Sequence, residues 1–181
     1  MNWPDCYAWL VTQPAGKARD SLLRLASTKV KISAPKPRLR LPRGQKRESL
    51  PGLKKELDRV FSIFVRLRDS DHVGIGACRT CGRTGHWTDM DAGHYVPRQD
   101  LIHRWNPKNV HLQCKPCNGF RGGEPEKMAE YIDRTYGKGT ARGLKDTVWM
   151  KFRYDRHWMR QGIAEYSSLI DPMPKNKKDG K

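Results

Sequence analysis

The sequence is short of acidic residues and of long apolar runs. Its 181 residues contain 36 Lys and Arg but only 19 Asp and Glu, for a formal net charge of +17. No apolar run approaches the ~20 residues of a membrane span, and the start, MNWPDCYAWLVTQ, has neither the basic region nor the apolar core of a signal peptide. These absences predict a soluble, cytoplasmic protein without a membrane partner. The charge favours nucleic acid as partner, against the alternatives of a merely soluble basic protein or one that binds acidic membrane.

Patterned apolar positions are scarce in residues 1–50. The stretch KVKISAPKPRLRLPRGQKR (29–47) combines prolines with many cations and has no acid, so neither a helix nor a packed core is expected there. We predict a flexible basic arm over 1–50 that neutralises phosphates, with a solvated linker of no further role as the alternative. A domain is expected over 51–172, followed by a basic tail at 173–181.

Helical periodicity of apolar residues appears in three segments. The sequence shows no internal repeat. Apolar residues at helical spacing predict a first helix over 53–69, behind Pro51-Gly52. A second is expected over 124–137 and a third over 155–170. Between the first two, residues 70–122 are rich in Gly, Cys and His, with short strand-like pieces. The chain length suits one domain, and the pattern predicts the α+β class.

Four of the five cysteines form two CxxC pairs, Cys78/Cys81 and Cys114/Cys117. Both thiolates of a CxxC can reach one ion, and two such pairs complete a tetrahedral shell, so we expect a structural Zn²⁺ site. A closed shell of four thiolates has no open position for catalysis. Cys6 stands alone and is predicted to be a free thiol without function.

The spacing between the pairs is unusual. Simple zinc ribbons keep about 15–20 residues there, whereas residues 82–113 make 32 residues here. The insertion carries polar and ionisable side chains at Asp89, Asp91, His94, Arg98, His103, Arg104, Asn109 and His111. Phosphodiester hydrolysis needs a base and a cation with its ligands. Histidine suits the base, and carboxylate and amide oxygens suit Mg²⁺ or Mn²⁺.

The stretches DAGHYVPRQ and RWNPKNVHLQCKPCN, followed by a Gly-Gly pair, resemble the HNH (ββα-metal) nuclease motif. In particular they resemble the phage NinG family, also called Rap, whose members are recombination endonucleases that cut branched DNA. The resemblance covers roughly Leu57 to Gly139. It implies a small ββα-metal core in which a hairpin carries a catalytic histidine, and a strand then leads into a short helix at the second cysteine pair.

The resemblance also implies roles for individual residues. His94 falls at the general base, Asn109 at the asparagine that braces the loop and orients that base, and Asn118 at the ligand of a catalytic Mg²⁺ or Mn²⁺. His111 joins the catalytic candidates, with a structural role as its alternative. The side chains expected to approach DNA are Arg98, Arg104, Lys108 and Arg121.

One position departs from the motif. Many HNH enzymes have an acid directly before the base, but Gly93 stands there and the nearest acid is Asp91. Residues three apart in a regular strand point to opposite faces, so Asp91 can join His94 only through a turn or bulge at Gly93. We expect Asp91 as a second ligand of the catalytic ion; otherwise His111 or a water takes that place.

The resemblance thus implies an HNH-type endodeoxyribonuclease of phage recombination that hydrolyses phosphodiesters in branched DNA, such as D-loops and Holliday junctions. The alternative is a non-catalytic, zinc-containing module that binds nucleic acid. Two coordinated cuts in a four-way junction would suit a homodimer. Phage or host recombination proteins are further expected partners.

Overall fold

The computed structural model describes residues 48–150 and 152–173. From Leu50 onward these residues belong to one compact unit. The predicted basic arm, apart from its last three residues, and Cys6 lie outside the described part of the chain, as does the tail from residue 174 onward. No helix among the described residues is long and apolar enough to cross a membrane.

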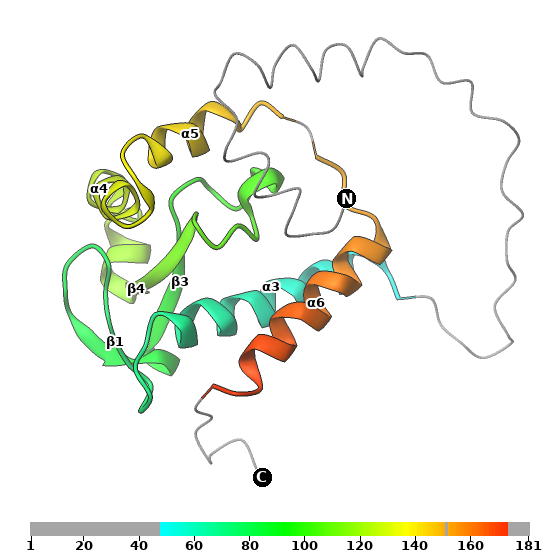
Figure 1. The fold of residues 1–181 in the computed structure, drawn as a ribbon, viewed down its shortest axis with the longest axis horizontal. Helices are drawn as coiled ribbons and strands as arrows, with labels where there is room; N and C mark the ends of the chain where they lie inside the picture. Colours follow the sequence, from blue (N-terminus) through cyan, green and yellow to red (C-terminus); the bar gives the residue numbers. More distant parts are fainter. Residues whose placement is uncertain (1–47, 151, 174–181) are drawn as a thin grey trace, which may run out of the picture. The chain divides into compact units, whose positions relative to one another are not determined.

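Two helices far apart in sequence form one side of the unit. Helix α3 (Leu50–Arg68) buries one apolar stripe and packs along α6 (Arg156–Ile170) (Figure 1). Phe61 of α3 meets Tyr166 of α6 edge-on, with ring centroids 4.9 Å apart. Helix α6 begins at Asp155, whose carboxylate accepts the Trp158 backbone N–H at 2.8 Å, as an N-cap residue does. Both predicted helices are therefore confirmed.

The strands form two separate antiparallel pairs. Strands β1 (Ile75–Ala77) and β2 (Thr84–His86) enclose the first cysteine pair. The single turn η1 (Trp87–Asp89) leads into β3 (Met90–His94), which pairs with β4 (Val110–Cys114). Every residue of β4 is buried.

A long loop joins β3 to β4 and contains the single turn η2 (Leu101–His103). Arg104 and Trp105 anchor this loop to α3, because both donate hydrogen bonds to the carboxylate of Asp58. The Trp105 side chain is fully buried, and its ring packs against Tyr154 at 4.8 Å between centroids. These contacts fix the β3–β4 loop to α3.

After β4 the chain makes one π-helical turn, η3 (Pro116–Phe120), and two further helices. Helix α4 (Pro125–Tyr136) starts with proline at its first position and ends at Gly137, whose φ of 106° favours glycine. Helix α5 (Thr140–Asp146) was not predicted from the sequence. A small apolar cluster links both helices to the end of β3: Tyr95, Val96, Met128, Ile132, Ala141 and Leu144. Helices and small antiparallel sheets together confirm the α+β class.

Candidate active site and metal centre

The four paired cysteines converge on one point. Their Sγ atoms all lie within 4.8 Å of one another, and among the described residues no other group of three or more His, Cys, Asp or Glu side chains could hold a metal ion. Cys78 and Cys81 come from the β1–β2 turn, whereas Cys114 ends β4 and Cys117 lies in η3. The four described thiols are free.

Backbone geometry shapes the first pair for a metal. Gly82 takes a φ of 75° and donates its N–H to the Cys78 carbonyl at 2.9 Å, and the Cys78 N–H bonds the Arg83 carbonyl at 2.8 Å. This tight turn brings the Cys78 and Cys81 sulfurs close enough to share one ion, as both thiolates of a CxxC pair do in zinc sites.

The electrostatics of the cluster also fit a cation. Burial raises the pKa of the Cys114 thiol to about 12, and hydrogen bonds with the neighbouring thiols contribute. Deprotonated sulfurs at this spacing repel one another unless a positive ion lies between them. The donor set and its geometry could therefore hold a metal such as zinc, which requires thiolates.

His94, the last residue of β3, is half-buried and hydrogen-bonded to the loop. Its Nε2 lies 3.0 Å from the Arg104 carbonyl oxygen. A carbonyl only accepts, so Nε2 carries the proton in the neutral ring and Nδ1 holds the lone pair. Burial lowers the pKa of His94; the carbonyls of Arg104 and Ala92 raise it, and the charges of Arg104 and Arg98 lower it further. The net lowering favours a neutral imidazole near pH 7, the form that can accept a proton.

Asn109 holds the same loop from inside. Its side chain is fully buried: Oδ1 accepts the Val96 N–H at 2.7 Å, and Nδ2 donates to the carbonyls of Val96 at 2.9 Å and His103 at 3.0 Å. The next carbonyl after His103 is that of Arg104, which bonds His94. Asn109 thus fixes the peptide segment that orients the histidine.

Asp91 and Asn118 also come together. Asn118 Nδ2 donates to Asp91 Oδ2 at 3.0 Å, which links η3 to β3. The bulge considered at Gly93 is absent: β3 and β4 pair residue for residue from Met90 to His94. Asp91 and His94 therefore leave opposite faces, about 10 Å apart along the strand.

Gly93 has a packing role instead. A Cβ atom at this position would collide with the side-chain amide of Gln113, which lies across the ladder near Gly93. The Gln113 Nε2 donates to the carbonyl of Gly123, in the loop that follows η3, at 2.8 Å. Glycine at position 93 thus leaves room for a side chain that ties β4 to the loop after η3.

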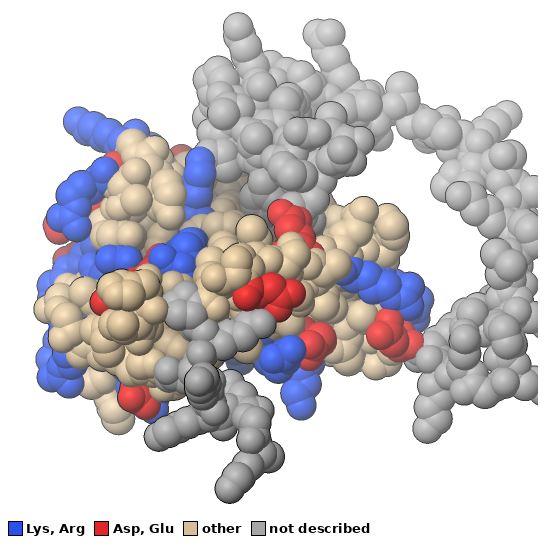
Figure 2. Space-filling model, turned by 60° about the horizontal axis from the view of Figure 1, so that its bottom comes forward, with Lys and Arg blue, Asp and Glu red and all other residues tan. Residues whose placement is uncertain are grey.

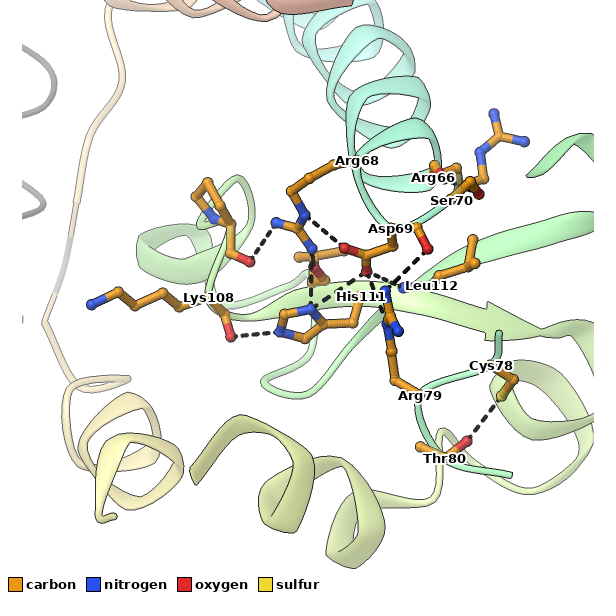
Figure 3. A network of polar contacts seen from close by, with 12 residues as sticks. Arg66, Arg68, Asp69, Ser70, Cys78, Arg79, Thr80, Lys108, His111 and Leu112 are labelled. Atoms are coloured by element: carbon orange, nitrogen blue, oxygen red, sulfur yellow. Dashed lines mark hydrogen bonds and ion pairs between the residues drawn. The ribbon is translucent and has the colours of Figure 1, made fainter. Parts of the chain in front are cut away.

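His111 belongs to a buried polar network at the end of α3 (Figure 3). Its Nε2 lies 3.0 Å from the Lys108 carbonyl, and its Nδ1 lies 3.1 Å from Arg68 Nη2. The Arg68 Nε also donates to Asp69 at 2.8 Å. His111 is fully buried with both ring nitrogens engaged, which favours the structural alternative for this residue.

The carboxylate of Asp69 is the acidic centre of that network. Burial raises its pKa, but contacts with His111, Arg68 and the Leu112 N–H lower the pKa well below the usual range. Asp69 Oδ2 accepts the Leu112 N–H at 2.9 Å and lies 3.7 Å from Arg79 Nε. Asp69 is a residue that the sequence reasoning missed, because two of its partners, His111 and Leu112, lie about forty positions further along the chain.

A family comparison covers most of the chain. The family model described as bacteriophage lambda NinG protein matches residues 12–175. The chain belongs to the NinG family. No curated protein and no solved structure matches it.

In this NinG-family chain the predicted DNA-binding cations have different surroundings. The Arg104 guanidinium makes a two-pronged contact with Asp58, at 2.7 and 2.6 Å, and donates to the Arg98 carbonyl at 2.7 Å. Only 11% of the Arg104 side chain is exposed, so the structure assigns it to holding the loop. Three of its N–H donors are engaged by Asp58 and the Arg98 carbonyl.

Arg98 and Arg121 are exposed, and Lys108 is half-buried. Arg121 makes one contact with Glu124, at 3.4 Å, and Lys108 Nζ lies 5.8 Å from the centre of the Tyr136 ring. Exposed ion pairs of this kind are weak and exchange readily with water or an anion. Arg98 and Arg121 are therefore the two predicted cations that face solvent in this NinG-family chain.

Proposed function

We propose that this NinG-family chain is a metal-dependent endodeoxyribonuclease of the HNH type that acts on branched DNA. The observation that carries the proposal is the connection from buried Asn109, through the His103–Arg104 peptide, to His94. This arrangement holds a neutral histidine in a fixed tautomer, as a general base requires. A module that only binds DNA has no need of it.

In the proposed reaction His94 takes a proton from the attacking water through Nδ1. A bound Mg²⁺ or Mn²⁺ would supply positive charge for the developing oxyanion. Asn118 would provide a ligand oxygen to that ion, and Asp91, which accepts the Asn118 amide N–H at 3.0 Å, would hold this amide in place. Mg²⁺ usually keeps several waters and takes few protein ligands, so a single amide oxygen from the protein would be compatible with its binding.

The choice of DNA rests on charge and family. The net charge is +17, and Arg98 and Arg121 are exposed near the proposed site. The preference for branched DNA follows from the resemblance to recombination endonucleases. A zinc-containing module that binds without cutting would share the charge and the cysteine cluster, so the dependence of binding on salt does not separate the two functions.

The deciding experiment compares labelled four-way junction with linear duplex in Mg²⁺, Mn²⁺ or EDTA. We expect the wild type to cut the junction in a metal-dependent way. His94→Ala should lose cutting and keep binding, whereas the control His72→Ala, at an exposed histidine outside the motif, should cut normally. If the wild type binds both DNAs and cuts neither in any metal, the chain is a binding module.

A further inference from the structure

Phe120 is exposed to an unusual degree. Its relative exposure is 92%, the largest of any big apolar side chain among the described residues. Aromatic side chains ordinarily contribute large buried areas to cores. Leaving Phe120 in water forgoes that contribution, so its position calls for an external contact.

The turn η3, which carries Phe120, is held in place by several contacts. The turn η3 begins directly after Cys114 and Lys115, and it contains Cys117, which is fully buried in the cysteine cluster. The Arg121 N–H bonds the Pro116 carbonyl at 3.0 Å, and the Gly123 N–H bonds the Cys117 carbonyl at 2.9 Å. The ring is therefore carried by a turn that the cysteine cluster holds in place.

Open space surrounds this support. A Cβ atom added at Gly119 or Gly122 would meet nothing within 4 Å. The described residues thus leave space at both glycines that flank this part of the turn. The ring can therefore enter a narrow gap in a partner without the neighbouring residues colliding.

The charges around Phe120 suit a polyanion. Lys115 and Arg121 are exposed on either side of it along the chain, and Asn118, the proposed metal ligand, lies two positions before it. In Figure 2 the Lys and Arg side chains gather most densely over the left part of the described surface, the side on which Figure 1 shows α4 and β1. An aromatic ring between cations is the combination that stacks on a base while the flanking phosphates are neutralised.

We propose that Phe120 is a wedge that stacks against a base at the branch point of DNA, with Lys115 and Arg121 on the adjacent phosphates. Inserting a side chain requires unstacking of neighbouring bases, and this costs least where stacking is already interrupted. Phe120 therefore selects branched over linear DNA. The inference rests on the proposed function insofar as DNA is the substrate, and it names the residue that chooses the DNA structure.

The test measures binding without divalent ions, so that no cutting is needed. A four-way junction carrying 2-aminopurine at the crossover, and a linear duplex, are titrated with the wild type, Phe120→Ala and Phe120→Trp. Loss of one stacked base weakens binding about ten-fold. We expect Phe120→Ala to lose about that factor on the junction and none on the duplex, and to lose the 2-aminopurine fluorescence increase, which Phe120→Trp retains.

Trp149→Ala is the matched control, since Trp149 is 64% exposed and lies outside η3. It should bind both DNAs as the wild type does, and all variants should melt at the wild-type temperature. The proposal is overturned by equal junction affinity of wild type and Phe120→Ala, by an equal loss in Trp149→Ala, or by a wild type that does not prefer the junction. A wild type that shows the Phe120-dependent preference but never cuts would refute the nuclease and leave the wedge. A Phe120→Ala variant that cuts and prefers junctions as the wild type does would refute the wedge and leave the nuclease.

Discussion

Three histidines close to one loop differ in what their ring nitrogens can do. His103 contacts Thr147 Oγ1 at 2.7 Å and Asn106 Nδ2 at 3.2 Å, and His111 contacts Lys108 and Arg68. Both use their two nitrogens to hold the protein together. His94 instead bonds backbone carbonyls, that of Arg104 through Nε2 and that of Ala92, and no side chain among the described residues. Position in the chain does not separate the three residues, but their hydrogen bonds do.

His103 should make stability depend on pH. Burial lowers the pKa of His103 to about 4, from an ordinary value of 6.5. The folded state therefore keeps His103 neutral while the unfolded state takes up a proton below pH 6.5. Stability from this residue is complete above that pH and is lost as the pH falls toward 4, by about 3 kcal/mol in total.

The measurement is urea unfolding at several pH values between 7 and 4, for the wild type and His103→Gln. Glutamine does not titrate and can still bond Thr147. We expect the difference in unfolding free energy between the two proteins to shrink or reverse as the pH falls. A difference that stays constant across this range would contradict the assignment.

At the scale of elements, α3 clamps the loop that carries the Arg104 carbonyl. Asp58 accepts two hydrogen bonds from Arg104 and one, at 2.9 Å, from Trp105 Nε1. Asp58→Ala leaves a mostly buried guanidinium and a buried indole N–H without their acceptor. We expect a loss of about 2 kcal/mol in unfolding free energy and, because the His94 acceptor shifts, slower DNA cutting.

The matched control lies on the same helix. Glu56 pairs with Arg59 at 2.7 Å, but these side chains are 45% and 59% exposed. Glu56→Ala should change the unfolding free energy by less than about 0.5 kcal/mol, since exposed pairs contribute little. Equal losses in the two variants, measured by chemical denaturation, would show that the Asp58 clamp adds nothing beyond a surface ion pair.

Periodicity predicted the elements that bury a continuous apolar face. The helices expected over 53–69, 124–137 and 155–170 correspond to α3, α4 and α6. Helix α5 was not predicted because it is short, contains a glycine and buries only Ala141 and Leu144. Local sequence carries little signal for a segment that packing alone keeps helical.

For the candidate site, the sequence predicted some of the residues but not the contacts between them. CxxC spacing identified the four cysteines, which the structure brings together, whereas His94 and Asn109 were singled out by the resemblance to the HNH motif. The sequence offered no sign of the Arg68–Asp69–His111 network, which depends on contacts between the end of α3 and β4. It also suggested a bulge at Gly93 that the regular ladder excludes. Sequence patterns thus named residues, whereas their partners depended on the fold.

For the whole molecule, the cysteine cluster joins the β1–β2 turn to the end of β4 and to η3. Around it lies a small buried group of Cys78, Met90, Leu112, Cys114 and Cys117. Structural zinc contributes about 10–16 kcal/mol in small peptides, whereas a typical domain is stable by only about 5–15 kcal/mol. A zinc ion bound at the four sulfurs would therefore account for most of the stability of the unit.

Removing the metal should unfold the centre of the unit. We expect a strong chelator to lower the melting temperature sharply and to reduce the far-ultraviolet circular dichroism signal, with both restored by added Zn²⁺. Cys114→Ser should melt early even with zinc present, because one ligand is lost, whereas Cys6→Ser should melt as the wild type does. Chelated protein that melts like the untreated protein would show that the four cysteines pack without a metal. The turn that carries Asn118 and Phe120 would then owe its rigidity to its hydrogen bonds and to the packing of Cys117.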